Sequence, residues 1–460
     1  CRCGSGGQRH GGGALMGRPG PRHCVALLMA APASGQGKTT ITAGLARLLK
    51  RQGKRVRVFK AGPDYLDPQI LQQASAAPVL QLDLWMAGEA YCRQALYDAA
   101  AEADLILVEG VMGMYDGEPS SADLAALFQM PLAIVMDVAG MAQTAAALAQ
   151  GLATYRDDLQ VAGLIANQCG SQRHRQLIAD ALPPSLPLLA ALPRESTVQL
   201  PERHLGLVQA QEIRADLEQQ LEAAADWLQQ SGILNGLPQL PPVAFYPAAT
   251  GALPPVPSDG LAGTRIAIAR DVAFSFIYDA NVLTLQQLGA EVLFFSPLNE
   301  TAVPQADALW LPGGYPELHA EALAANVSMT QSMRDFVASG KPVLAECGGF
   351  LYCLQGLTDL QGKRTPMLGV LPGEGRMRDR GGCQGMQSAP LPEGEIRGHA
   401  HHRSMSENTP APLAYGRRQR HPAPGEAIYR QGSLTATYLH LFFSSNPQAV
   451  ARLFKPDGQH

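Results

Sequence analysis

The chain has 460 residues, of which 46% are hydrophobic and 17% are charged, and its formal net charge is −4. This length and apolar content predict two or three domains with a large core. Acidic and basic residues are mixed along the chain without a basic patch, which argues against a nucleic-acid partner. The longest apolar runs are strand-sized, so we predict no transmembrane helix and no membrane partner. The eight cysteines form no C-x-x-C pair, which indicates reduced thiols rather than a disulfide framework.

Residues 1–22 differ in composition from everything that follows. They are rich in Gly and Arg, show no apolar periodicity and contain no apolar stretch of the kind found in signal peptides. We predict a disordered or non-native extension in which Met16 is a candidate start. The sequence leaves open whether residues 1–15 are translated.

A glycine-rich segment, P-A-S-G-Q-G-K-T-T at residues 32–40, lies between a predicted strand at 25–31 and a predicted helix at 41–49. Strand, glycine-rich turn and helix in this order predict a phosphate-binding loop, in which Lys38 reaches the β- and γ-phosphates and Thr39 binds Mg²⁺. The first glycine of the usual pattern is replaced by Pro32, and an ordinary strand-to-helix turn is the alternative. The predicted ATP ligands of this loop are Ser34, Gly35, Gly37, Lys38, Thr39 and Thr40. A loop of this kind needs cytosolic ATP, so we predict a cytoplasmic protein.

Two carboxylate clusters follow predicted strands. The strand at 55–61 runs into G-P-D-Y-L-D-P, which carries Asp64 and Asp67, and the strand at 104–108 runs into E-G-V-M-G-M-Y-D-G, which carries Glu109 and Asp116. In parallel sheets this edge binds ligands, and Glu109 stands where P-loop enzymes carry a metal-binding acid. For Asp67, capping of the following helix is an equally good interpretation. Between the clusters, Leu80, Leu82, Leu84 and Trp85 predict a helical region.

Further apolar strands at 131–137 and 161–167 alternate with helices at 141–152 and about 209–230. Asn167 ends the second of these strands, where it can read an adenine edge or serve as a turn residue. The alternation predicts an α/β domain with a doubly wound parallel sheet over residues 23–232. A Pro-rich stretch with little periodicity predicts a linker at 233–262.

A second α/β pattern occupies residues 263–460. Its predicted strands lie at 265–270, 291–295, 307–311 and 342–346, and the last runs directly into Cys347 and two glycines. A sharp turn from strand to helix exposes a nucleophile and directs helix N–H groups at it, which lowers the pKa of a thiol. We predict a catalytic thiol at Cys347 and an oxyanion hole. The predicted oxyanion donors are Gly313, Gly314 and Gly348.

A thiolate nucleophile needs a base, and two histidine regions lie downstream. G-H-A-H-H at 398–402 is dense enough to suggest a metal, but no Cys or carboxylate accompanies it at ligand spacing. T-A-T-Y-L-H at 435–440 predicts a strand that ends in His440. We therefore predict His440 as the base.

Nearly the whole chain, from about residue 24 to 447, resembles the cobyrinic acid and hydrogenobyrinic acid a,c-diamide synthases of vitamin B12 biosynthesis. The matching segments are A-P-A-S-G-Q-G-K-T-T, G-P-D-Y-L-D-P, Q-L-D-L-W-M, E-G-V-M-G-M-Y-D-G, P-G-G-Y-P-E, A-E-C-G-G-F and T-Y-L-H-L-F-F. The resemblance implies a domain similar to dethiobiotin synthetase and a flavodoxin-like class I glutamine amidotransferase domain. It also implies ATP, Mg²⁺, L-glutamine and a corrinoid whose a- and c-carboxylates become amides through acyl phosphates.

Carried over to this chain, the resemblance assigns individual roles. It assigns metal binding to Thr39, Asp64 and Glu109. It assigns corrinoid and acyl-phosphate binding to Asp64, Tyr65, Asp67 and Asp116. It also implies that the glutamyl thioester forms on Cys347, with His440 as base. Phe442 stands where many related amidotransferases carry a Glu, so we predict a Cys–His dyad. At 397–404, His399 and His402 match the family, whereas Ala400, His401 and Arg403 depart from it.

Several alternatives stay open. Related ligases are cobyric acid synthase and nickel-sirohydrochlorin a,c-diamide synthase; a P-loop ATPase switch is a remote rival, because Ala33 stands where such switches carry Lys. The sequence does not distinguish cobyrinate from hydrogenobyrinate. It also leaves open a homodimer, the order of amidation, the ammonia route between domains and the group that orients His440.

Overall fold

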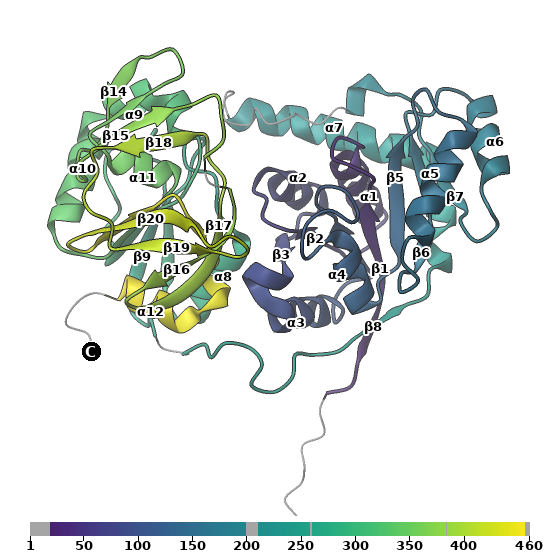
Figure 1. The fold of residues 1–460 in the computed structure, drawn as a ribbon, viewed down its shortest axis with the longest axis horizontal. Helices are drawn as coiled ribbons and strands as arrows, with labels where there is room; N and C mark the ends of the chain where they lie inside the picture. The colour runs from purple at the N-terminus through teal and green to yellow at the C-terminus, as the bar shows by residue number, and fades with distance from the viewer. Residues whose placement is uncertain (1–18, 199–209, 258–259, 383, 456–460) are drawn as a thin grey trace, which may run out of the picture.

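The computed structural model describes residues 19–198, 210–257, 260–382 and 384–455, and these form two α/β domains (Figure 1). The first domain, purple to teal, and the second, green to yellow, are joined by an extended segment that follows β8 (Val243–Phe245). No helix among the described residues is long and apolar enough to cross a membrane. Residues 1–18 of the predicted extension at 1–22 lie outside the described residues.

The first domain is built on a parallel sheet with the strand order β3-β2-β4-β1-β5-β6-β7. Its strands are β1 (Arg22–Ala30), β2 (Val56–Ala61), β3 (Leu80–Leu82), β4 (Leu105–Glu109), β5 (Leu132–Asp137), β6 (Val161–Asn167) and β7 (Leu188–Ala191). The apolar strands are buried on both faces because helices cover both, as in doubly wound folds. One face packs against α1 (Lys38–Arg51), α2 (Leu66–Ser75) and α7 (Ala210–Ser231). The other packs against α3 (Glu89–Ala99), α4 (Ser121–Phe128), α5 (Gln143–Thr154) and α6 (Gln172–Ala181). The predicted doubly wound sheet is confirmed.

Two segments of this domain differ from the sequence-based prediction. Leu80–Leu82 is strand β3, and only Leu84–Gly88 is helical, as the π-helix η1. The predicted linker of 233–262 begins too early, because Ile233 and Leu237 are buried in the core and β8 pairs antiparallel with β1. The Pro-rich composition of this stretch gave no signal for its burial or for strand β8. Arg22 pairs with Phe245, so the first domain also starts before residue 23.

The second domain contains a ten-stranded sheet in the order β10-β9-β11-β12-β21-β20-β19-β16-β17-β22. The parallel part consists of β9 (Arg265–Ala269), β10 (Glu291–Phe295), β11 (Ala308–Leu311), β12 (Val343–Glu346) and β21 (Leu434–Thr437). Numbered along the chain, these five have the order 2-1-3-4-5, which is the flavodoxin-like order predicted. The antiparallel part consists of β16 (Gly385–Leu391), β17 (Gly394–Ala400), β19 (Ala414–Arg418), β20 (Pro424–Gln431) and β22 (His440–Leu441).

Helices again cover both faces of the parallel part. On one face lie α9 (Ala320–Ala325), α10 (Val327–Ala338) and α11 (Gly348–Cys353); on the other lie α8 (Asp279–Gln287) and α12 (Pro447–Phe454). A small second sheet contains β13 (Gly356–Thr358), β14 (Arg364–Pro366), β15 (Glu374–Met377) and β18 (Ser404–Glu407). The predicted strand at 435–440 is divided: β21 ends at Thr437, and His440 begins the separate strand β22, which pairs with β17.

The two domains contact each other directly. Gln69 Nε2 donates to Ser275 O at 3.0 Å, and the Val79 N–H donates to Asp279 Oδ2 at 3.2 Å. Tyr278 and Phe442 of the second domain are buried in the apolar core of the first. The two domains therefore share a packed interface.

Candidate functional sites

The phosphate-binding loop joins β1 to α1 as predicted. Gly35 and Gly37 have φ angles of 79° and 95°, which only glycine adopts without strain, so the loop backbone depends on them. Lys38 is buried, and its Nζ donates to Met112 O at 2.8 Å in the loop after β4. Burial lowers the pKa of Lys38. The lysine thus lies between the phosphate-binding loop and the glycine-rich loop that carries Glu109 and Asp116.

A compact cluster of charges lies beside this loop. Thr39 Oγ1 donates to Glu109 Oε1 at 2.7 Å, and the same oxygen accepts from Lys60 Nζ at 3.0 Å. Lys60 Nζ also lies 2.7 Å from Asp67 Oδ2 and 3.7 Å from Asp64 Oδ2. The structure therefore brings together Asp64, Asp67 and Glu109, three of the four acids that the sequence places after β2 and β4.

Burial sets the ionisation of this cluster. Burial of Lys60 would lower its pKa, but the carboxylates of Glu109, Asp67 and Asp64 outweigh it and raise the pKa. Burial also raises the pKa of Glu109 and of Asp64. For Asp67, the nearby Lys60 ammonium overcomes burial and lowers the pKa. A lysine that stays charged inside an acidic cluster can hold an anion, such as a phosphoryl group or a carboxylate.

The two acids in the loop after β2, Asp64 and Asp67, differ in role from what the sequence predicted. Asp64 Oδ1 accepts from the Leu66 and Asp67 N–H groups at 2.9 and 3.2 Å, so Asp64 rather than Asp67 caps α2. Asp67 is left to pair with Lys60. The interpretation of Asp67 as a helix cap is therefore wrong.

Asp116 and Asn167 lie at the margin of the site. Asp116 is exposed, and its Oδ2 accepts from the Gly113 N–H at 3.1 Å within its own loop. Asn167 Nδ2 donates to Gln36 O at 3.0 Å, so in this structure its side chain supports the phosphate-binding loop. Its part in adenine recognition stays a prediction.

The second centre is formed by Cys347 at the turn from β12 to α11. Cys347 has φ 45° and ψ −101°, a strained conformation typical of nucleophile elbows, and its N–H donates to Thr437 O at 2.8 Å. Burial raises the pKa of its thiol, with Glu317 adding to the rise and the Gly348 N–H opposing it. The expected lowering by the helix N–H groups is therefore outweighed by burial, because Cys347 is only 5% exposed.

The histidine predicted as base lies next to the predicted oxyanion loop. A Cβ atom added to Gly313 would lie 3.1 Å from His440 Nδ1 and closer still to Cε1, and one added to Gly348 would lie 2.9 Å from Gly314 N. The structure thus brings the three glycines and His440 together around the Cys347 elbow. Burial lowers the pKa of His440, and His399, whose ring stacks on it at 5.0 Å, adds to this effect. A neutral imidazole is the form that accepts a thiol proton.

Other histidines near this centre have structural partners. His399 accepts from or donates to the Tyr278 hydroxyl at 3.2 Å, and burial lowers its pKa to about 3. His402 is bonded to Glu426 Oε1 at 2.9 Å and stacks on Tyr438. Among the described residues, no group of three or more His, Cys, Asp or Glu side chains is arranged to hold a metal by itself.

Tyr65 connects the two centres. It belongs to the first domain, next to Asp64, yet its ring stacks on Tyr278 at 4.3 Å and on Phe276 at 5.0 Å, and lies 5.2 Å from the ring of His440. The loop that carries the acids of the first centre therefore touches the base of the second. Phe442, which replaces the Glu of related enzymes, is buried and packs edge-on against Tyr278 and Tyr91.

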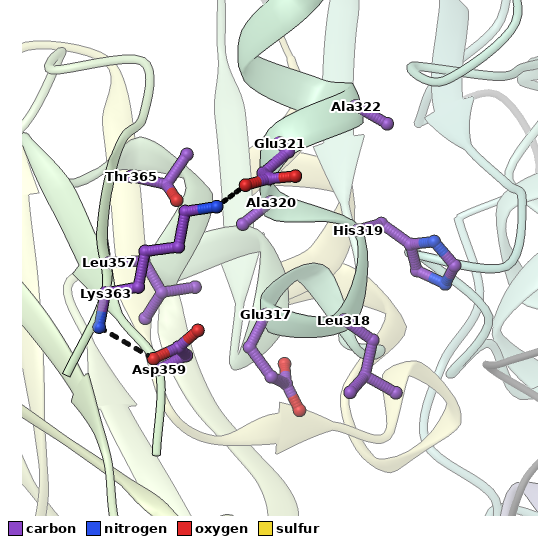
Figure 2. Close-up of a pocket in the computed structure, with 10 residues that line it drawn as sticks. All are labelled: Glu317, Leu318, His319, Ala320, Glu321, Ala322, Leu357, Asp359, Lys363 and Thr365. Carbon is purple, nitrogen blue, oxygen red and sulfur yellow. Dashed lines mark hydrogen bonds and ion pairs between the residues drawn. The ribbon is translucent and has the colours of Figure 1, made fainter. Parts of the chain in front are cut away.

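A cavity of about 470 Å³ opens between η5 (Pro316–His319), the start of α9 and the β13–β14 hairpin (Figure 2). Figure 2 shows Lys363 paired with Glu321 across it, and Glu317 at another part of its wall. Burial raises the pKa of Glu317 to about 7. Glu317 also contributes to the raised pKa of the Cys347 thiol, so this wall of the cavity interacts electrostatically with the nucleophile.

Three buried polar residues of these sites were missed by the sequence analysis. Lys60 lies at the end of β2, where a lysine in an apolar strand directly before G-P-D was a usable signal. Glu346 precedes Cys347 in a buried strand and gave a similar signal. Tyr278 reaches the interface from the second domain, and no local pattern pointed to it.

Comparison with known proteins identifies the family. Residues 27–208 match the family described as a CobQ/CobB/MinD/ParA nucleotide binding domain, and residues 265–448 match the one described as a CobB/CobQ-like glutamine amidotransferase domain. The chain is 54% identical to the hydrogenobyrinate a,c-diamide synthase of Stutzerimonas stutzeri over 95% of this chain and 99% of that protein. It is 52% identical to the enzyme of that name from Pseudomonas aeruginosa, over 94% and 98%. It is 48% identical to the cobyrinate a,c-diamide synthase of Herminiimonas arsenicoxydans, over 94% and 97%. The chain therefore belongs to the family of hydrogenobyrinate and cobyrinate a,c-diamide synthases, and it combines a nucleotide-binding domain with a glutamine amidotransferase domain.

Proposed function

We propose that this enzyme uses ATP and glutamine to convert the a- and c-carboxylates of hydrogenobyrinate into amides. The names of the two relatives at 54% and 52% identity support hydrogenobyrinate, and the name of the third supports cobyrinate as the alternative. The same names favour the a,c-diamide reaction over the related cobyric acid and nickel-sirohydrochlorin enzymes. The function of a P-loop ATPase switch is not supported, because it does not account for the glutamine amidotransferase domain that carries Cys347.

In the first step, a substrate carboxylate oxygen attacks the γ-phosphorus of ATP, which gives an acyl phosphate and ADP. Lys38 and Lys60 are proposed to neutralise the charge on the transferred phosphoryl group, since electrostatic stabilisation is the main contribution that proteins make to this reaction. Asp64, Tyr65, Asp67 and Asp116 are proposed to orient the corrinoid. Ammonia then attacks the acyl carbon and displaces phosphate, which forms the amide.

The residues present fit a Mg²⁺ ion. Glu109 Oε2 is buried and has no hydrogen-bond partner among the described residues, and Thr39 Oγ1 lies beside the same carboxylate. Mg²⁺ commonly takes only one or two protein ligands together with phosphate oxygens. Thr39, Glu109 and Asp64 are the residues proposed to hold it, and the ion would neutralise phosphate charge.

Ammonia is proposed to come from the second centre. His440 takes the proton of Cys347, the thiolate attacks the side-chain amide carbon of glutamine, and the N–H groups of the oxyanion glycines stabilise the oxyanion. His440 gives the proton to the departing nitrogen, ammonia leaves, and water hydrolyses the thioester to glutamate and free Cys347. Glutamine is proposed to enter through the cavity beside Glu317, which leaves the Tyr65 side for the passage of ammonia.

The observation that carries this proposal is the position of Tyr65, which directly follows Asp64 in the chain and whose ring lies 5.2 Å from the ring of His440. This contact supports the transfer of ammonia between the two proposed centres. The test is Cys347→Ala, assayed with glutamine and, separately, with an ammonium salt. We expect glutamine-dependent amidation to be lost and ammonia-dependent amidation to survive. Loss of both activities in a folded variant would contradict this division between the domains.

A further inference from the structure

Glu346 is a buried acid for which the reaction described above has no task. It is the last residue of β12, directly before Cys347, and is 1% exposed. A buried carboxyl group is retained only where its oxygens have hydrogen-bond donors. The donors that Glu346 binds therefore indicate what it holds in place.

Its two oxygens bind two different strands. Oε1 accepts from the Leu441 N–H at 2.8 Å, and Oε2 accepts from Trp310 Nε1 at 3.0 Å. Leu441 directly follows His440, and Trp310 lies on β11, which leads into the oxyanion loop. A single carboxyl group thus joins the strands that carry the nucleophile, the base and the oxyanion glycines.

The strand that carries His440 needs such a support. β22 has only two residues, and it is separated from β21, which ends at Thr437. His440 Nδ1 is buried and has no hydrogen-bond partner among the described residues, so no side chain orients the ring through that atom. A catalytic base is normally oriented by a third group. Here the fixation falls on the backbone at Leu441, whose carbonyl oxygen also accepts from Asn281 Nδ2 at 2.8 Å.

We propose that Glu346 is the positioning residue of the amidotransferase centre and that it fixes His440 through the Leu441 amide. This inference rests on the proposed function, because it assumes that His440 serves as the base for Cys347.

The surroundings of Glu346 make its effect dependent on pH. Burial raises the pKa of Glu346 to about 8, against the opposing hydrogen bonds from Leu441 and Trp310. The titratable groups that its charge reaches are Cys347, Tyr65 and Tyr278, whose pKa values are raised mainly by burial and further by Glu346. His440 and His399 lie on the neighbouring strands β22 and β17. A carboxyl group that changes charge near pH 8 should therefore leave a mark on glutamine hydrolysis.

The test compares Glu346→Gln with wild-type full-length enzyme. At pH 9, where the wild-type carboxyl group is ionised, we expect kcat for glutamine hydrolysis to fall at least 30-fold, the rate of Cys347 alkylation by iodoacetamide to fall with it, and KM for glutamine to stay within threefold. The change in kcat that the titration of Glu346 causes near pH 8 in wild type should be absent from the pH profile of the variant. Ammonia-driven amidation and the thermal midpoint report whether the variant is folded. Glu393→Gln is the matched control, since Glu393 is a partly buried acid of the same domain that pairs with Arg430, and it should leave kcat within twofold.

A second pair of variants isolates the Leu441 bond. Trp310→Phe removes one donor and leaves the Leu441 bond, so kcat should fall by less than fivefold. In Glu346→Gln/Trp310→Phe the side-chain amide no longer faces the indole N–H, so its oxygen can accept from Leu441 and kcat should recover at least fivefold relative to Glu346→Gln.

Two results would overturn the inference. One is a Glu346→Gln enzyme with kcat and pH profile like wild type; the other is parallel loss of ammonia-driven and glutamine-driven amidation, which would mean that Glu346 only stabilises the fold. Wild-type enzyme without glutamine hydrolysis would instead contradict the proposed function, and the inference with it.

Discussion

The Gly313→Ala substitution tests where the base lies. Gly313 is packed so closely against His440 that an added Cβ atom would lie 3.1 Å from Nδ1 and closer to Cε1. Ordinary van der Waals contact between such atoms is about 3.5–4.0 Å, so the imidazole ring must move by roughly 1 Å. The backbone N–H of residue 313 remains, because alanine keeps it. The substitution therefore displaces the base without removing an oxyanion donor.

A misplacement of about 1 Å in a catalytic group costs roughly 100-fold in rate, or about 2.7 kcal/mol of activation free energy. We expect kcat for glutamine hydrolysis to fall by about that factor. The assay is glutamate release under saturating glutamine, with ammonia-dependent amidation measured in parallel on the same preparation. The ammonia-dependent rate should stay within about twofold, since the ligase centre is formed by the other domain.

Gly151→Ala is the control, because Gly151 lies within α5 and a Cβ atom there meets nothing within 4 Å. It should leave both rates unchanged and stabilise the protein slightly, by up to about 1 kcal/mol. If Gly313→Ala hydrolyses glutamine within threefold of wild type, His440 is not the base in the position described, and the reasoning fails.

Three further predictions concern the charged groups. Lys60→Met should lower amidation with either nitrogen source by a factor on the order of 10²–10³ and reduce the free energy of unfolding by about 3–5 kcal/mol, since it leaves the buried Glu109 and the half-buried Asp67 without their cation. Both amidation assays and urea unfolding test this, and a variant with unchanged rates and stability would contradict the role of Lys60. Glu317→Gln should raise KM for glutamine by about 10–100-fold through loss of a charge-assisted hydrogen bond to the amino group of glutamine. Glu321→Gln is the control and should have a smaller effect, because Glu321 already pairs with Lys363. Equal effects of the two substitutions would argue against the entry of glutamine through this cavity. Finally, the pKa of Glu346 is about 8 in the folded state and 4.5 in the unfolded state. The free energy of unfolding of wild type, relative to that of Glu346→Gln, should therefore be greatest below pH 4.5 and decline as pH rises through 8. A difference between their free energies of unfolding that is constant from pH 5 to 8.5 would refute that assignment.

The sequence predicted the parts of each site that depend on local patterns. Glycines at positive φ, acids at the ends of buried strands and a cysteine at a strand-to-helix turn each have a short-range physical cause, so Gly35, Glu109 and Cys347 could be identified from the chain alone. The flavodoxin-like strand order followed from the resemblance to a known family. Both domain types are confirmed by the observed sheets.

What the sequence could not predict depends on contacts between distant segments. The stacking of Tyr65 on Tyr278 joins residues 213 positions apart, and nothing near Tyr65 indicates an aromatic partner. The Glu346 bond to Leu441 spans 95 positions and uses a backbone N–H, which carries no sequence signature. Asp64 caps α2, whereas the sequence analysis considered only Asp67 as a possible cap, because the side-chain geometry of the loop decides which acid reaches the free N–H groups. β8 was missed for a related reason: a three-residue strand is held by pairing with β1, not by its own composition.

The central claim is most directly tested by corrinoid-dependent ADP release with glutamine and Mg²⁺, measured separately on hydrogenobyrinate and cobyrinate, with the mass of the product recorded. We expect two ADP released per hydrogenobyrinate and a product in which two carboxylates have become amides. Double amidation of cobyrinate alone would correct the substrate and keep the mechanism. Absence of corrinoid-stimulated ADP release with both substrates would contradict the account.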